Sequence, residues 1–513
     1  MPLPTTDTAW PPKHLEQITP TLTAWSAWWT GNPDQLTAVY RTGGPTRGPV
    51  TRPSQLRGGV VGAAARFWWG RPQNSGQRQD FTHVPLAADI ARTSADLLFS
   101  EPPTIHVEDT TTQGYLDDTL ADPLFATLTG GAEAAAALGG VYLRVTWDPA
   151  VADHAFVTVV PADEAVPEFT WGRLRAVTFW HVVDRDGSTV WRHLERHELL
   201  PTGIGVIQHG LYQGSPDRLG RPVPLTDKAA TAPLADAVAA DGYVAAGRTP
   251  GLSVVYIPNT DPATAKAWRG VAPAGGLGAA DIDGIESLLD DLDEIHAAWM
   301  RDIRLAKARL VVARYMLDDN GPGAGASMDL DREVFAPLKL AAAEEGDAPI
   351  TPVQFAIRFE EHRASAQEWS DRIVQSAGYS VQTFGEQGET SQTTATEVMA
   401  RESRSLKTRG RKLRLWRPAL QELVGKLLSV NADVFHQRHE GTGLTVSFPD
   451  GIWETPLQAA QTAAALRAAE AASTRTLVAL VHPDWDAVRV DAEAVAILRE
   501  RGVPVGDPFA ITE

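Results

Sequence analysis

One long amphipathic pattern, over residues 281–314, constrains the fold of this chain more than any other feature. Carboxylates fill its first half and basic side chains its second, an order that suits the helix dipole. Its apolar residues recur at steps of three and four, as one stripe on an α-helix requires: Ile285, Leu288, Leu289, Leu292, Ile295, Trp299, Ile303, Ala306 and Leu310. A helix of about 33 residues would reach roughly 50 Å, so its stripe needs a long neighbour.

The neighbour that the sequence offers is a second helical pattern over residues 357–378. The forty residues between the two patterns differ in kind, with short apolar runs at 309–317, 333–340 and 350–357 that are typical of strands and a glycine-rich stretch at 319–327. Thr351-Pro352 could also begin a helix. We place a strand first and the helix from about Ile357, which gives two rods that carry a compact tip.

The rest of the chain combines helices with a β-region. Residues 1–80 are rich in Pro, Gly and Thr with short helical pieces, and are predicted to be an arm or a loosely packed lead-in. Helices are expected at 84–100, 116–138 and 394–435, the last bent at Pro418. Period-two stretches predict strands at 141–147, 155–160, 174–183, 189–198, 206–212, 253–259 and 445–450. Residues 379–393 are predicted to be an exposed polar loop, and 455–513 a small helical cap. The class is therefore α+β.

The amino-acid composition excludes several kinds of site and several classes of protein. The 513 residues contain no cysteine, which excludes disulfides and thiolate metal sites and fits a reducing compartment. We find no apolar run long enough to span a membrane and no signal peptide. The formal net charge is −18, whereas proteins dedicated to gripping nucleic acid are usually basic. Of the 16 tryptophans, Trp25, Trp28 and Trp29 cluster near the start, which suits core and subunit packing or an interface hot spot.

Few sequence motifs indicate a catalytic or metal-binding site. His193, Glu195 and His197 alternate along one strand and could present ligands to a metal, which would make the 141–212 region a metal-dependent enzyme. The other interpretation is a polar strand face in solvent or at an interface. Phosphate-binding and nucleophile-elbow motifs are absent from the sequence, and no cofactor is predicted.

Two further stretches have both an ordinary and a functional interpretation. The basic run 401–417 either faces phosphate or pairs with acidic neighbours, including those on another subunit. The polar loop 379–393 is either a solvated connector or a mobile element that faces a channel.

Five segments, in this order, resemble the portal proteins of tailed double-stranded DNA phages, in particular those of long-tailed phages and prophages. They are VPLAADIARTSADLLFSEPP (84–103), IDGIESLLDDLDEIHAAWMRDIRLAKARL (282–310), SMDLDREVF (327–335), ITPVQFAIRFEEH (350–362) and AGYSVQTFG (377–385). The resemblance extends over roughly residues 80–500. It implies a non-enzymatic protein that forms a ring, commonly of twelve subunits, around a DNA channel at one capsid vertex.

The resemblance also implies a division of the chain. Residues 1–80 would be an arm or outer wing, 81–280 the wing, 281–313 and 357–378 the stem helices, and 314–356 the clip. Residues 379–393 would be the tunnel loop, 394–450 a long kinked wing helix with a strand, and 451–513 a helical crown.

Sites and partners follow from the same resemblance. The DNA-facing residues of the tunnel loop would be Gln382, Thr383, Phe384, Gln387, Thr390, Ser391 and Gln392. A basic ring in the channel would come from Arg301, Arg304 and Lys307. The clip would dock the motor and adaptor through Asp329, Asp331, Arg332, Glu333, Lys339, Glu344 and Glu345. The implied partners are the terminase large subunit, a head–tail adaptor, the major capsid and scaffolding proteins, and DNA of any sequence. The protein would sit in the virion after assembly in the host cytoplasm.

Overall fold

The computed structural model confirms the α+β class. It describes residues 3–42, 82–239, 242–305, 309–312, 318–319, 326–327, 350–353, 357–385, 395–437, 439–449, 456–482, 485 and 487–500. The helices are α1 Thr19–Thr30, α2 Pro33–Thr42, α5 Leu86–Phe99, α6 Thr110–Tyr115, α7 Ala121–Leu138, α8 Leu234–Ala237, α9 Glu286–Leu305, α10 Phe359–Ala377, α11 Ala395–Val434, α12 Pro456–Ala468, α13 Thr474–Val481 and α14 Ala487–Glu500. None of these described helices combines the length and apolarity that crossing a membrane requires.

The strands form one larger and several small antiparallel sheets. Strands β4 Ala165–Thr170, β5 Arg173–Asp186, β6 Thr189–Leu199, β7 Ile204–Ser215 and β8 Arg218–Val223 follow each other in one sheet, with β9 Val244–Pro250 paired to β7. A second sheet has the order β10 Val254–Pro258, β2 Gly140–Thr146 and β3 Phe156–Pro161. Strand β1 Thr104–His106 pairs with β15 Thr445–Ser447. All seven predicted strands of the β-region and its C-terminal neighbour are therefore present.

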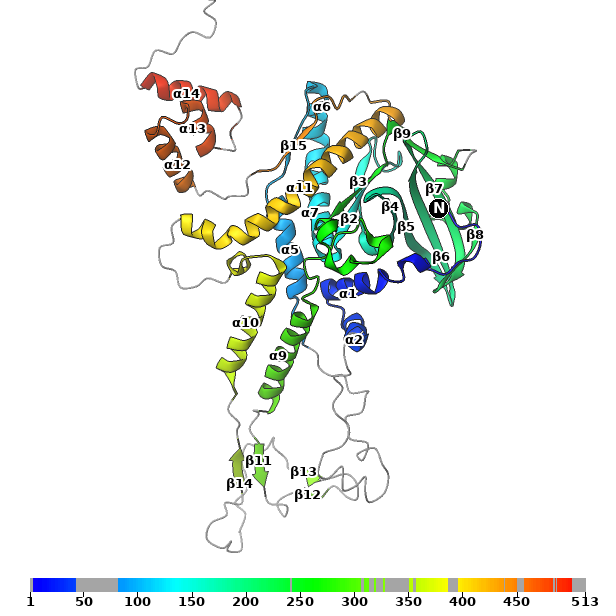
Figure 1. The fold of residues 1–513 in the computed structure, drawn as a ribbon, viewed down its shortest axis with the longest axis vertical. Helices are drawn as coiled ribbons and strands as arrows, with labels where there is room; N and C mark the ends of the chain where they lie inside the picture. Colours follow the sequence, from blue (N-terminus) through cyan, green and yellow to red (C-terminus); the bar gives the residue numbers. More distant parts are fainter. Residues whose placement is uncertain are drawn as a thin grey trace, which may run out of the picture.

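The body of the molecule has three layers. Helices α7 and α11 cover one face of the β10-β2-β3 sheet and α5 packs against both helices, so that Leu98, Leu143 and Trp416 share a buried cluster (Figure 1). The other face of that sheet meets the larger sheet through a second cluster that includes Tyr142 and Phe179, with ring centroids 5.5 Å apart. Strand β2 is accordingly buried along most of its length, with Val141, Leu143 and Val145 facing the helices.

Strands β1, β4, β8 and β9 were not predicted from the sequence, and β4 shows why. Its residues, AVPEFT, include a proline and a glutamate, and they lack the alternation that marks a half-buried strand. A tight turn joins it to β5, with Trp171 at φ 53° and Gly172 at φ 74°. Both central residues are left-handed, as the favoured two-residue hairpin requires, and the Trp171 side chain is 98% exposed.

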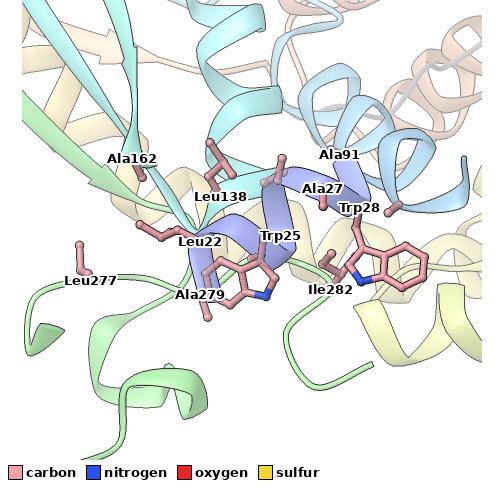
Figure 2. Close-up of a cluster of buried hydrophobic side chains, with 14 of the residues drawn as sticks. Leu22, Trp25, Ala27, Trp28, Ala91, Leu138, Ala162, Leu277, Ala279 and Ile282 are labelled. Atoms are coloured by element: carbon pink, nitrogen blue, oxygen red, sulfur yellow. The ribbon is translucent and has the colours of Figure 1, made fainter. Parts of the chain in front are cut away.

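The prediction of a loosely packed arm is wrong for helix α1. Trp25 and Trp28 are 0% and 2% exposed and lie among Leu22, Leu138 and Ile282 (Figure 2). The indole N–H of Trp25 donates to Glu286, the first residue of α9, at 3.0 Å. The core interpretation of these two tryptophans is thus confirmed within the chain itself. The short helical pieces predicted for residues 1–80 are present as α1 and α2, but the loose packing expected of them is not found for α1.

The two rods are present, but α9 is shorter than the predicted 281–314 helix. Residues 281–284 form turns, with Gly284 at φ 80°, and the helix begins only at Glu286. It spans 20 residues, about 30 Å. Beyond it, β11 Arg309–Val312 pairs with β14 Ile350–Val353, so the strand-first prediction for residues 350–357 is confirmed. A short pair, β12 Asp318–Asp319 and β13 Ala326–Ser327, also belongs to the tip. The predicted strand at 333–340 lies outside the described residues.

Helix α11 confirms the helix predicted over residues 394–435, with Pro418 in its interior. It contains 40 residues with Pro418 inside, and it changes direction along its length (Figure 1). The C-terminal helices α12, α13 and α14 form a separate small group in which Val478, Val490 and Ala494 are buried together. This agrees with the helical cap that the alanine-rich sequence predicts.

Candidate functional site

The two rods contact each other through aromatic and charged side chains near their far ends. Trp299 on α9 meets Phe359 edge-on at 5.6 Å and stacks on His362 at 6.0 Å. One oxygen of Asp302 accepts from Arg358 at 2.8 Å and lies 2.9 Å from the His362 ring. The hydrogen bond with His362, followed by that from Arg358, lowers the pKa of Asp302. These contacts hold α9 and α10 side by side beyond the body (Figure 1).

One rod covers only part of the other's apolar stripe. Met300 and Ile303 on α9 are each 38% exposed, while Ile357 and Phe359 are 43% and 47% exposed. Trp299 is half-buried. The paired rods therefore leave apolar side chains at the surface of the single subunit.

A buried ion pair joins the root of α9 to α11. Lys412 lies 2.7 and 2.9 Å from the two carboxylate oxygens of Asp281, and both side chains are 5% exposed. The Tyr379 hydroxyl donates to Asp281 at 2.7 Å, Asn259 donates at 2.8 Å, and Lys412 also reaches Ser94. Burial raises the pKa of Tyr379 well above its usual range, and the Asp281 charge adds to this rise. Burial lowers the pKa of Lys412 although Asp281 opposes it. We call these five residues the Asp281 junction.

The first part of the predicted polar loop rests on α11. Tyr379 and Ser380 are buried, and residues 381–384 form a half-buried 3-10 turn labelled η9. The Ser380 N–H donates to Ser405 at 2.9 Å, and the Thr383 hydroxyl lies 2.8 Å from the same side chain. The prediction of an exposed loop from residue 379 is therefore wrong for its first six residues. Tyr379 gave the signal, because a ring at that position is rare in a solvated connector.

A polar cluster fills the space between the two sheets. Glu195 accepts from His197 at 2.6 Å and from Arg144 of β2 at 2.6 Å, and His197 also contacts Ser253 at 2.9 Å. His193 lies 3.2 Å from His209 of β7. Burial would raise the pKa of Glu195, but the hydrogen bond and charge of His197 and the charge of Arg144 hold it well below its usual range.

This cluster tests both interpretations of residues 193–197, the metal site and the polar strand face. His193 and His197 are 3% and 1% exposed, so the prediction of a polar face in solvent or at an interface is wrong. Both oxygens of Glu195 and both ring nitrogens of His197 are used in contacts within the protein. Among the described residues, no group of three or more His, Asp or Glu side chains is arranged to hold a metal. The arrangement is that of a satisfied buried network.

We expect His193 to make the protein sensitive to acid. Burial lowers its pKa from 6.5 to about 3, and His209 and His181 add to the shift. Between these values the unfolded chain binds a proton that the folded chain does not, so stability falls as pH falls through this window. Moving from pH 7 to pH 5 should cost about 2 kcal/mol from this residue alone.

Urea denaturation of the wild type and of His193→Gln, at both pH values, checks this expectation. The variant should lose about 2 kcal/mol less than the wild type on acidification. The exposed His14, replaced by Gln, is the matched control and should leave the pH dependence unchanged. Equal losses in all three proteins would contradict the assignment to His193.

The chain can now be compared with known proteins. A family model described as "Phage portal protein, SPP1 Gp6-like" matches residues 71–501, which include the body, both rods, the loop and α11. The chain belongs to this family of phage portal proteins. It therefore has a portal function, and its family is one of structural components of the phage particle.

Among solved structures, similar chains come from the necks of two GTA particles. One, from a native particle computed with C12 symmetry, is 12% identical and has a TM-score of 0.34, with 79% of this chain and 91% of that chain covered. The other, from an empty particle computed with C6 symmetry, is 11% identical with the same TM-score and coverages. No curated protein sequence matches this portal protein.

The residues predicted to act in the portal are only partly described. Gln382, Thr383 and Phe384 lie in η9, and Arg301 is exposed on α9. Arg304 lies one turn further along α9. The remaining ones lie outside the described residues: Gln387, Thr390, Ser391, Gln392, Lys307, Asp329, Asp331, Arg332, Glu333, Lys339, Glu344 and Glu345.

The basic run 401–417 divides between two faces of α11. Lys412 and Arg409 point into the body, where the Arg409 guanidinium donates to the backbone carbonyls of Leu97 and Pro449, each at 2.6 Å. Arg404, Lys407, Arg411, Arg414 and Arg417 are exposed. The sequence could have given this division, because Arg409 and Lys412 share the helix face of Trp416. Only part of the run is therefore available to a partner.

Proposed function

We propose that this portal protein assembles into a closed ring, commonly of twelve copies in proteins that it resembles, through which double-stranded DNA passes without sequence readout. The observation that carries the proposal is the match to the portal family across the rods, loop and α11. The half-exposed stripe of Met300, Ile303, Ile357 and Phe359 supports it, since a neighbouring subunit would cover these side chains. We infer that the ring works without catalysis and that it needs no cofactor.

The charge of the chain suits a conducting channel. Each copy carries a formal charge of −18, so a ring repels phosphate within a Debye length of about 8–10 Å. DNA can then slide without adhering to the wall. A few cations from Arg301, Arg304 and Lys307, in the stem segment 281–313, would keep it centred.

We further propose how the chain is divided. Residues 1–80 and 81–280 serve as the outer wing and wing, 281–313 and 357–378 as stem, and 314–356 as the clip that docks the terminase large subunit and later the head–tail adaptor. Residues 379–393 serve as the tunnel loop, 394–450 as the long wing helix and strand, and 451–513 as the crown. Capsid and scaffolding proteins surround the ring during assembly in the host cytoplasm.

The mass of the purified assembly tests whether the protein forms a closed ring. Mass photometry and negative-stain microscopy of the purified protein, alone and with its capsid components, should give closed rings of a single subunit number. A protein that stays monomeric or dimeric at micromolar concentration in several salts, with and without capsid components, would contradict the proposal.

Shortening the loop should separate assembly from DNA handling. Deleting residues 386–391 spares Tyr379, Ser380 and Thr383, whose contacts with the body and α11 are structural. We expect rings of normal mass that package or retain much less DNA, because the element that faces the DNA is missing. The measurements are ring mass and the length of nuclease-protected DNA in assembled particles.

The matched control removes contacts instead of length. Ser405→Ala keeps the loop intact and loses the α11 hydroxyl that meets Ser380 and Thr383, so it should lower thermal stability while packaging continues. If the 386–391 deletion abolished ring formation, the loop would have a structural role and its assignment would be wrong.

A further inference from the structure

Four basic side chains form a row along the outer face of α11. Arg404, Lys407, Arg411 and Arg414 follow each other at steps of three, four and three residues, which places them on one side of a helix. All four are exposed, while Trp416 and Lys412 on the opposite side are buried. The row is about 15 Å long. We call it the basic stripe.

The basic stripe borders a shallow groove with a glycine in its wall. The groove is lined by the four basic residues and Gly410 and has a volume of about 530 Å³. A side chain at Gly410 would meet open space, since nothing lies within 4 Å of a Cβ built there. Glycine inside a helix costs about 1 kcal/mol relative to alanine. Here it leaves the space between the cations free for a ligand.

The charges of the basic stripe have no counterions within the described residues. No described carboxylate forms an ion pair with any of the four side chains, and Arg411 donates a hydrogen bond to the Thr408 hydroxyl at 3.0 Å. Like charges three and four residues apart on a helix repel each other, so the row weakens α11 unless an anion binds it. In a chain with a net charge of −18, such a row is an exception.

Two kinds of anion could bind there: nucleic-acid phosphate or an acidic surface of another copy. On the described rod α10, Arg363 lies between Glu361 and Glu368, so that helix offers a second copy no continuous acidic row. The carboxylates in the first half of α9 are the acidic surface that the ring-mass measurement below tests. The stripe itself contains no aromatic ring, which base stacking would need. Evenly spaced cations without rings fit the sugar–phosphate backbone.

We propose that the basic stripe binds the backbone of double-stranded DNA, independently of sequence, as a second DNA contact beside the tunnel loop. This inference rests on the proposed function, because α11 begins directly after the loop and DNA that passes the loop would meet the stripe next. An acidic wall lets DNA slide, whereas each phosphate contact adds affinity. The stripe therefore opposes sliding and favours retention of DNA.

The test measures DNA binding as a function of salt. The probe is a fluorescent duplex of about 30 base pairs, titrated with the full-length protein at about 50–200 mM NaCl. Replacing Arg404, Lys407 and Arg414 together by Gln spares Arg411, which bonds within the helix. Affinity at low salt should fall about tenfold, and the slope of log K against log salt should become shallower by about 2.7.

A second triple variant removes the same number of positive charges at positions outside the basic stripe. Arg173, Arg175 and Arg269 are exposed and lie far from α11 in sequence, and their replacement by Gln should leave affinity within about threefold of wild type. If both variants bind DNA alike, or if the wild type does not bind the duplex at low salt, the stripe is not a DNA site.

Ring mass separates the remaining outcomes. If the stripe variant fails to form rings while the control forms them, the stripe is a contact between copies and the inference is overturned. If the wild type forms no rings at all, the proposed ring fails, yet a stripe-dependent salt slope would still support DNA binding by α11. The two proposals can therefore fail separately.

Discussion

Replacing Lys412 by Ala should destabilise the portal subunit by about 3–5 kcal/mol. The substitution leaves the Asp281 carboxylate buried without its cation, with Tyr379 and Asn259 as the remaining hydrogen-bond donors. An uncompensated buried charge is costly, because little solvent reaches a side chain that is 5% exposed. Urea denaturation followed by tryptophan fluorescence measures the loss.

The same helix supplies the control for this prediction. Lys407→Ala removes the same charge from an exposed position and should change stability by no more than about 0.5 kcal/mol. A double-mutant cycle with Asp281→Asn should give a favourable coupling energy between the two side chains of about 1–3 kcal/mol. If Lys412→Ala proved as mild as Lys407→Ala, water must reach the Asp281 junction and the junction would not be a buried pair.

The contacts of the Asp281 junction could not be predicted from the sequence. Helices α5, α10 and α11 and strands β2, β3, β5, β6, β7 and β10 follow from periods of 3.6 and 2 and from turn residues, all of which are local signals. Asp281 and Lys412 are 131 positions apart, and no local signal pairs them. The sequence therefore predicts the elements and their order, whereas the contacts that join them depend on how the layers pack.

The contacts of the polar cluster around Glu195 could not be predicted from the sequence either. Glu195 and His197 look like metal ligands in sequence because alternation places them on one strand face. Only the packing of β2 against that face shows that Arg144 and Ser253 already occupy their polar atoms. The length of α9 was overestimated for a related reason. The amphipathic pattern overlaps the apolar run 309–317, which the sequence also indicates as a strand, and the pairing of residues 309–312 with β14 confirms the strand there.

Replacing Trp25 by Ala should also cost about 3–5 kcal/mol, and should weaken the root of the first rod. The side chain is 0% exposed and meets the Trp268 ring edge-on at 5.3 Å. Its loss leaves a cavity between α1 and the start of α9 and removes the donor to Glu286. Thermal denaturation measures the overall loss, and limited proteolysis reports whether cleavage near residues 281–305 becomes faster.

Two substitutions separate the contributions of volume and hydrogen bonding. Trp25→Phe keeps most of the ring and loses the indole N–H, so its cost should be nearer 1–2 kcal/mol. Trp171→Ala removes an equally large side chain that is 98% exposed, and it should be close to neutral in the isolated subunit. If Trp25→Ala were as mild as Trp171→Ala, α1 would not be part of the core. The N-terminal residues would then be an appendage, as their composition suggests, and α9 would be held to the body by contacts other than those of α1, such as the acceptance by Asp293 of the Val84 N–H.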